Sequence, residues 1–436
     1  MLMSNNTSRR LALLATACLL GVALPAGAAY AQEAKTKTTT PAAQAMHSDV
    51  AITIPDIEAI DSNVDEATLR DIFSGNLADN AEALAGLTAT SITIPEITIQ
   101  TSMDVEGDSV ASSVTVTDLV LTDITAGVAG KIALAGMDVD GGEEGTAQFG
   151  TVSAADFNIA GVLGLYGLVD DDSEPQAELQ TIYTDFSFEG GTLETPELTC
   201  TIGAVTAAEF KARPLSFSLT ELVAVADQVE AQEDDPSPEL VGKMLHMYAD
   251  LFTALESSPI EFDGLDCSGV DENDRPMSFT IAGMSMGGMS PGIYPSITMD
   301  GLDVTVEGDG SVAVGNVTIE EMDLSGPIAA IQAAPAALDD AWFTENARAL
   351  IPEFGGFSVS DIAVDVPDTE NPASRIQATV ASFELALSDY LNGIPTTMRL
   401  AAANIVADLP TDTADPQIDQ LIALGVTTID AGFTVA

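Results

Sequence analysis

The chain has 436 residues, and its 68 acidic and 13 basic side chains give a formal net charge of −55. A nucleic-acid-binding surface is excluded, because contact with a phosphate backbone needs clustered Lys and Arg. Disorder of the whole chain is excluded as well, since 46% of the residues are hydrophobic, more than an acidic disordered chain carries. A chain of this length and composition can bury a core, in two or more units.

The N-terminus has the three parts of a secretory signal peptide. Residues 9–10 are two arginines, residues 11–23 are apolar, and Ala29 and Ala31 place small residues ahead of a cleavage site before Gln32. No later apolar run is long and continuous enough to span a membrane as a helix. We therefore expect a periplasmic or secreted protein.

Two other export signals compete with this interpretation. Ser8 with the following arginines resembles a twin-arginine signal, so the choice between the general and the twin-arginine route stays open. Cys18 follows small residues, as in a lipoprotein box, but apolar Leu19 and Leu20 directly after it count against lipidation.

Beyond residue 50, apolar and polar residues alternate with the period of two that is typical of β-strands. One series is Ile92, Ile94, Ile97 and Ile99, and a second is Val114, Val116, Leu119 and Leu121. Gly-Asp and Asp-Gly steps, such as residues 307–310, predict hairpin turns between strands. We expect antiparallel strands in succession.

The sequence is similar to itself at an offset of 165 residues. Residues 132–139 (IALAGMDV) match residues 297–304 (ITMDGLDV), and Gly127 falls on Gly292. Apolar positions fall on apolar positions throughout the surrounding stretch. We interpret this as a tandem duplication, followed by looser copies of the same pattern.

Two longer helices are predicted between the repeats. Residues 219–231 begin with a capping box formed by Ser218 and Glu221. Residues 238–256 carry one apolar stripe, with Ser237 as the expected N-cap and Pro238 in the first turn.

Removal of the leader leaves two cysteines, Cys200 and Cys267. In an oxidising compartment such a pair predicts one disulfide, whose loop of roughly 67 residues would add about 4 kcal/mol by chain entropy. Two buried thiols are the alternative. The disulfide would join the segments on either side of the helical pair.

These observations predict a mainly β (α+β) protein built of tandem duplicated antiparallel repeats, each introduced by a helix, in an elongated or curved sheet. The expected organisation is a signal peptide (1–31), a flexible tether (32–50), a first helix-plus-sheet repeat (51–214), a second repeat (215–326) with the helical pair 219–256, a third, looser repeat (327–410) and an incomplete or capping repeat (411–436).

Catalytic motifs are scarce. Residues 283–287 form a G-x-S-x-G sequence, but a hydrolase needs a helix after Ser285 and a later histidine. The two histidines, His47 and His246, both come earlier. Few histidines also weaken general acid–base and zinc chemistry. We expect no enzymatic activity.

Calcium is the metal that the acidic turns favour, and we expect no other cofactor. The candidate ligands are Asp170, Asp171, Asp172, Asp271 and Asp274, with solvated turns as the alternative interpretation.

Two further motifs resemble metal sites. Residues 61–65 begin like an EF-hand loop, but Glu66 replaces the required glycine, so helix capping explains them better. Met284, Met286 and Met289 could be read as Cu(I) ligands; their alignment with apolar strand positions predicts core-facing side chains instead.

Two functions follow. The first is a non-catalytic envelope scaffold whose sheet holds a lipid-like apolar ligand or other envelope components. Small and flexible apolar residues with few aromatics would suit acyl chains, and the succession of short amphipathic strands is similar in kind, at the level of the fold, to that of periplasmic lipid-bridging proteins of the AsmA type. A structural or interaction module without a small ligand is the alternative. The second is a secreted Ca²⁺-binding adhesin or surface-layer-like protein. Simple salt adaptation would also explain the acidity.

The distribution of apolar side chains separates these functions. A ligand-holding sheet keeps one face apolar beyond what its core needs, whereas an adhesin places acids on both exposed faces.

Overall fold

The computed structural model describes residues 48–105, 108–169, 178–230, 232, 236–367, 375–408, 420, 424 and 428–435. The fold is mainly β, and its strands pair antiparallel, as the alternating pattern predicts. The predicted signal peptide and nearly all of the predicted tether lie outside the described residues. Within them, no helix combines the length and the hydrophobicity needed to cross a membrane.

The chain forms two compact units. Unit 1 comprises Met1–Pro196 and Ala204–Glu221, and unit 2 comprises Glu197–Gly203 and Leu222–Ala436. The chain therefore contributes one short segment to unit 2 before it completes unit 1. Helix α6 (Leu219–Glu230) lies at the change from one unit to the other.

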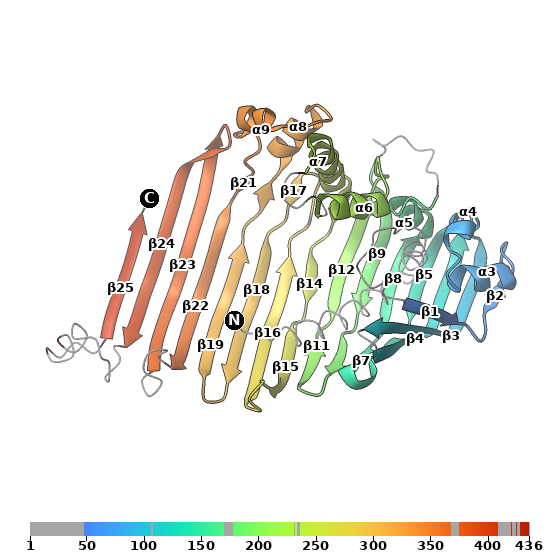
Figure 1. The fold of residues 1–436 in the computed structure, drawn as a ribbon, viewed down its shortest axis with the longest axis horizontal. Coiled ribbons are helices and arrows are strands. Elements are labelled where there is room, and N and C mark those ends of the chain that lie inside the picture. The colour runs from blue at the N-terminus through green and yellow to red at the C-terminus, as the bar shows by residue number, and fades with distance from the viewer. Residues whose placement is uncertain are drawn as a thin grey trace. The chain divides into compact units, whose positions relative to one another are not determined.

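Unit 1 is a branched antiparallel sheet with three short helices (Figure 1). Its helices are α3 (Glu66–Phe73), α4 (Ala81–Ala85) and α5 (Ile159–Leu165), and its strands are β1 (Ser48–Thr53), β2 (Glu58–Ile60), β3 (Ala89–Val105), β4 (Asp108–Thr125), β5 (Val128–Leu134), β6 (Gly136–Asp140), β7 (Thr146–Phe149), β8 (Val152–Asn158), β9 (Gln180–Phe188), β10 (Gly191–Glu194) and β12 (Val205–Ala212). Strand β4 pairs with β3 on one side and with both β5 and β6 on the other. From there the sheet continues as β5–β8–β9–β12 and as β6–β7–β10.

The core of unit 1 lies between the sheet and its helices. Leu69 of α3, Leu84 of α4 and Leu163 of α5 belong to one buried cluster with strand residues such as Val116 and Leu121. The apolar series predicted on β3 and β4 thus faces a core that aliphatic side chains fill.

Unit 2 is a long antiparallel meander (Figure 1). Its helices are α7 (Pro238–Thr253), α8 (Ser325–Gln332) and α9 (Asp340–Asn346), and its strands are β11 (Leu198–Ile202), β13 (Leu255–Ser257), β14 (Ile260–Phe262), β15 (Leu265–Val270), β16 (Pro276–Met286), β18 (Ile297–Val306), β19 (Gly310–Ile319), β22 (Gly356–Pro367), β23 (Arg375–Leu391), β24 (Ile394–Asp408) and β25 (Thr428–Val435), with a small separate sheet of β17 (Ile293–Tyr294), β20 (Met322–Asp323) and β21 (Glu353–Phe354). The main sheet runs β11–β15–β16–β18–β19–β22–β23–β24–β25.

The local sequence signals act as predicted. The Ser218 hydroxyl accepts a hydrogen bond from the Glu221 amide at 3.1 Å, and that of Ser237 accepts one from the Leu240 amide at 3.3 Å. Helix α7 begins at Pro238, as expected, and ends at Thr253, three residues before the predicted end. Residues 307–310 form the hairpin turn between β18 and β19, since Val306 pairs with Gly310.

Left-handed residues interrupt the strands of unit 2. Gly301 of β18, Asp361 of β22 and Asn404 of β24 have φ angles of 60°, 52° and 49°. We call these three residues the left-handed row. Only Gly, Asn and Asp adopt this conformation readily.

Each such residue shifts the alternation of the strand by one position. On β22 the apolar positions are Phe357 and Val359 before Asp361, and Ile362 and Val364 after it. The extra residue keeps the apolar side chains on one face although the strand is interrupted. Asp118 in β4, with φ of 50°, does the same in unit 1, where Val116 and Leu119 are both buried.

Candidate functional site: the apolar face of unit 2

One face of the unit 2 sheet is lined by apolar side chains from strand to strand. The register places them in four rows of cross-strand neighbours, which together we call the apolar face. The rows are Met286–Ile297–Ile319–Phe357–Leu385–Leu400–Val435, Met284–Met299–Val317–Val359–Phe383–Ala402–Phe433, Ile281–Leu302–Val314–Ile362–Val380–Ile405–Ala431, and Phe279–Val304–Val312–Val364–Ala378–Ala407. The left-handed row runs between the second and the third of these.

The opposite face carries small and polar side chains. One of its rows is Ser285–Thr298–Thr318–Ser358–Glu384. Its polar groups bond with one another: the Asn316 amide donates to the Asp300 carboxylate at 2.8 Å, and the Thr318 hydroxyl donates to Asn316 at 3.0 Å. Acids therefore lie on one face of this sheet, and hydrocarbon lies on the other.

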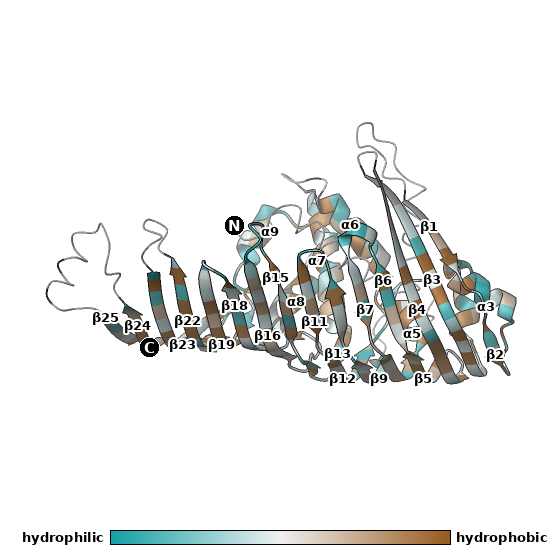
Figure 2. Ribbon diagram, turned by 90° about the horizontal axis from the view of Figure 1, so that it is seen from below, coloured by the Kyte–Doolittle hydropathy of each residue, from teal (hydrophilic) through white to brown (hydrophobic). Residues whose placement is uncertain are grey.

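The apolar face is exposed to an extent that a protein core is not. Among the described residues of β16 to β25, Ala402 is the one apolar side chain that is buried. Met284 and Ile319 are 41% exposed. Figure 2 shows hydrophobic stretches recurring on successive strands of this sheet, β19 and β22 among them.

The helices of unit 2 do not account for this face. Their buried cluster consists of Ala249, Ile328 and Ile331, packed against Leu245, Phe252, Leu324, Trp342 and Leu350, all from α7, α8, α9 and the segments beside them. The helices thus pack on one another, at one end of the strands in Figure 1.

The prediction that Met284 faces a core is wrong. Its counterpart at the offset of 165 residues, Leu119, is 9% exposed in unit 1, whereas Met284 is 41% exposed in unit 2. β4 and β16 share the same alternation of apolar and polar residues, but this alternation determines only which side chains lie on the same face of a strand. What covers that face is set by other segments of the chain.

A hollow of about 340 Å³ lies on the polar face. Its lining includes small side chains in register, Ala313, Ala363 and Thr379, together with Asp365 and Asp408. We do not assign the site there, because its strongest polar group is already engaged within the protein.

That group is the Asp365 carboxylate. It accepts a hydrogen bond from Arg375 Nε at 2.6 Å and one from the Gln377 amide at 3.1 Å. The bond from Arg375 is the main cause that lowers the pKa of Asp365.

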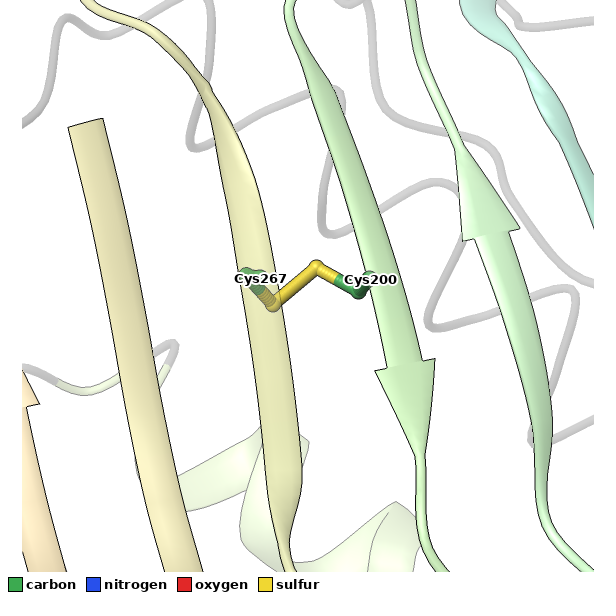
Figure 3. Close-up of a disulfide and its surroundings, with 2 residues drawn as sticks. All are labelled: Cys200 and Cys267. Carbon is green, nitrogen blue, oxygen red and sulfur yellow. A yellow bond between two sulfur atoms is a disulfide. The ribbon is translucent and has the colours of Figure 1, made fainter. Parts of the chain in front are cut away.

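The predicted disulfide is present. Cys200 of β11 and Cys267 of β15 stand directly opposite each other in the register and are bonded, with their Cα atoms 4.0 Å apart (Figure 3). Both residues are buried, at 4% exposure. The bond fixes β11, the early segment of the chain, into the sheet of unit 2.

The calcium candidates divide into two groups. Asp170, Asp171 and Asp172 lie outside the described residues. Asp271 and Asp274 lie in the turn between β15 and β16. Within the described part of the chain, no three His, Cys, Asp or Glu side chains come close enough together to hold a metal ion. Calcium binding stays a prediction.

The Asp271 carboxylate is occupied by protein donors. Arg275 donates to it from Nε at 2.9 Å and from its backbone amide at 2.9 Å, and the Asn273 amide donates at 2.9 Å. The hydrogen bond from the Arg275 side chain is the main cause that lowers the pKa of Asp271 well below its usual range.

The segment that begins like an EF-hand loop caps a helix. The Asp65 side chain accepts a hydrogen bond from the Thr68 amide at the start of α3.

The serine of the G-x-S-x-G sequence does not stand at a turn from a strand to a helix. Ser285 lies within strand β16, paired with Glu261 and Thr298, without a following helix. His246 lies half-buried in the middle of α7, and His47 lies outside the described residues. Comparisons of the chain with models of protein families, with curated proteins and with solved structures found no match.

Proposed function

We propose that this chain is an exported, non-catalytic binding protein that holds the acyl chains of a lipid-like ligand on the apolar face of unit 2. The observation that carries the proposal is the exposure of that face: within the described residues Ala402 is the one buried side chain of its four rows, and Met284 and Ile319 are 41% exposed. Burial of such a surface is favourable at about 25 cal/mol per Å², so an apolar occupant would bind there.

The dimensions of the face suit an acyl chain laid across the strands. At about 4.8 Å between neighbouring strands, the rows from β16 to β25 extend for about 29 Å. The hydrocarbon core of a bilayer is about 30 Å thick and holds two opposed acyl chains, so one chain reaches about 15 Å. A row is therefore long enough for a whole chain.

Unit 1 indicates the chemistry of the occupant. On β4, the apolar series that corresponds to the one on β16 belongs to a single buried cluster with Leu and Ile side chains, such as Leu69 and Ile72 of α3. Branched hydrocarbon fits that surface closely enough to bury Val116 completely. We infer that hydrocarbon also suits the equivalent face of unit 2.

This comparison rests on a tandem duplication, which we propose as the origin of the chain. It is supported by backbone hydrogen bonds that recur at the offset of 165 residues. The Gly127 amide donates to the Leu87 carbonyl, and the Gly292 amide to the Phe252 carbonyl, both at 2.9 Å. Both glycines have positive φ, of 76° and 81°. The finer organisation, in which a helix introduces each repeat, belongs to the same proposal.

The experiment is to purify the mature protein from its own envelope fraction and to measure it by native mass spectrometry, with solvent extraction of any adduct. We expect a stoichiometric lipid mass. A fluorescent fatty acid, used at concentrations where it is monomeric, should also bind to the delipidated protein. Absence of both would overturn the proposal in favour of a purely structural module.

Matched variants locate the ligand. Ile319→Glu puts a charge on the apolar face at an exposed position, whereas Thr305→Glu adds the same charge at an exposed position of the polar face. We expect Ile319→Glu to weaken fatty-acid binding at least about tenfold, because a charge opposes contact with hydrocarbon. Thr305→Glu should leave it unchanged. Equal effects of the two would place the ligand elsewhere.

A further inference from the structure

The turn between β23 and β24 carries two large hydrophobic side chains that are strongly exposed. Leu391 and Ile394 pair across the end of this hairpin and are 65% and 48% exposed. Ile351, which follows α9, is 43% exposed. Side chains this exposed at the tip of a hairpin do not contribute to a hydrophobic core.

These residues form one surface with an arginine. Gly393, between Leu391 and Ile394, has φ of 75°, and a Cβ built on it would lie 2.4 Å from the Arg348 carbonyl oxygen and 3.4 Å from the Ile351 Cβ. The hairpin turn therefore rests on the segment 348–351. We call Arg348, Ile351, Leu391 and Ile394 the tip patch.

Arg348 is a cation in a strongly acidic chain. Its side chain is exposed, and within the part of the chain that the structure describes it makes no ion pair. Arg275, Arg375 and Arg399 of the same unit are each bonded to an Asp or Glu. The guanidinium of Arg348 is thus available to an anionic group outside the protein.

The tip patch lies at the end of β23 and β24 that is nearest to the first row of the apolar face. Met398, two positions before Leu400 of that row, extends the apolar face toward this end and is 54% exposed. Left-handed Asp389, with φ of 55°, then shifts the alternation, so Leu391 and Ile394 lie on the other side of the hairpin from Met398. A lipid at the tip patch therefore reaches the apolar face around the end of the hairpin.

We propose that the tip patch is where the protein contacts a lipid bilayer, and that lipid passes between the bilayer and the apolar face at this end of β23 and β24. Aliphatic side chains at a protruding turn enter the acyl boundary, and an adjacent arginine binds lipid phosphate. The inference rests on the proposed function, since it assigns the place at which that ligand is loaded.

Charge defines the kind of bilayer. A chain with a net charge of −55 is repelled by an anionic membrane surface at low ionic strength. Contact therefore depends on the apolar tip and on zwitterionic headgroups, whose phosphate suits Arg348. The tip patch prefers neutral bilayers to anionic ones.

The test is flotation of the full mature chain with phosphatidylcholine vesicles. We expect the wild-type protein to float with the vesicles. The double variant Leu391→Ser/Ile394→Ser should partition at least about tenfold less, because two aliphatic side chains no longer leave water. Arg348→Gln should lower partitioning about fivefold.

The matched control is Val223→Ser on α6, which removes a side chain of similar exposure, 42%, from another surface; its flotation should be unchanged. Replacing part of the phosphatidylcholine by phosphatidylglycerol should weaken wild-type binding at low salt, and added salt should restore it. Wild-type flotation of the Leu391→Ser/Ile394→Ser variant would overturn the proposal. So would a loss of self-association, instead of vesicle binding, in that variant on size-exclusion chromatography with light scattering.

A second measurement separates this inference from the proposed function. Monomeric fluorescent fatty acid reaches the apolar face directly from water, so the Leu391→Ser/Ile394→Ser variant should bind it with wild-type affinity. Failure of the wild-type protein to bind fatty acid would reject the proposed ligand. Failure of flotation alone would reject only the tip patch as the docking surface.

Discussion

Asp361 of β22 faces Gly315 of β19 so closely that a Cβ built on Gly315 would lie 2.8 Å from the Cβ of Asp361. Unit 1 repeats the arrangement, with Gly130 of β5 opposite Asp123 of β4, at 3.2 Å. Both aspartates are left-handed, with φ of 52° and 53°. In both pairs the residue opposite the left-handed aspartate is one without a side chain.

Gly315→Ala should lower the free energy of unfolding by about 1–3 kcal/mol, because the added methyl group displaces Asp361 or the strands themselves. Gly164→Ala is the matched control: Gly164 lies in helix α5, and a Cβ there meets nothing within 4 Å. It should leave stability unchanged or raise it by up to about 1 kcal/mol. Chemical denaturation measures both. Equal stabilities of Gly315→Ala and wild type would show that the sheet absorbs the contact.

The left-handed conformation of Asp361 predicts that substitutions at this position differ in their effect on stability. Asp361→Asn should change stability little, since asparagine also adopts positive φ. Asp361→Val should cost about 1–2 kcal/mol, because a branched side chain clashes with its own backbone there. Ser358→Val, on the same strand at ordinary φ, serves as control and should not destabilise. A similar loss of stability in Asp361→Val and Ser358→Val would mean that an exposed hydrophobic side chain, and not the positive φ of residue 361, causes the loss.

The disulfide should contribute by limiting the unfolded chain. It closes a separation of 67 residues, for which loop entropy predicts about 4 kcal/mol. We expect the Cys200→Ser/Cys267→Ser variant to unfold at a lower denaturant concentration than the wild type, and reductant to shift the wild type alone toward the variant. No shift with reductant would mean that the bond is absent in solution. Mapping of the Cys200–Cys267 peptide without reduction checks this directly.

The turn between β15 and β16 should respond to acid. The pKa of Asp271 is lowered, chiefly by the side-chain hydrogen bond from Arg275, so the carboxylate favours the folded state. Because the folded pKa lies below the unfolded one, near 4, this contribution is complete above pH 4 and is lost as the pH falls through the folded value.

NMR titration of the carboxyl resonances tests this assignment. Arg275→Ala should raise the pKa of Asp271 and leave that of Asp365 unchanged. Arg375→Ala should do the reverse, since its own side chain is the main cause of the lowered pKa of Asp365. An Asp271 pKa that does not move in Arg275→Ala would assign the shift to the backbone amides of the turn.

Local features of the fold could be predicted because their causes are local. Ser218 and Ser237 cap helices through amides three residues ahead, and residues 307–310 turn a hairpin through their own backbone. The strands were also predictable, but the left-handed row was not. Its signal is a gap of three positions where two are expected, as between Val359 and Ile362, with a Gly, Asp or Asn inside the gap.

The candidate site could be predicted only in part. The alternation of apolar and polar residues predicts that each strand has an apolar face. The small polar residues that alternate with the apolar ones, such as Thr318, lie on the opposite face. Exposure does not follow from either. Leu119 and Met284 occur in matching patterns, but only Leu119 is buried, in a cluster that includes helix residues far from it in the sequence, such as Leu69. Separate segments decide whether a face becomes a core or a surface.

The path of the chain through β11 has a consequence for proteolysis. Residues between Cys200 and Cys267 include β12 of unit 1 and helix α7 of unit 2, all within one covalent ring. A protease that cuts once inside this ring therefore releases nothing: the two polypeptides stay joined and separate only after reduction. Nor can either unit be excised as one continuous stretch of sequence, so an expressed fragment that starts after residue 222 lacks the strand to which Cys267 is bonded.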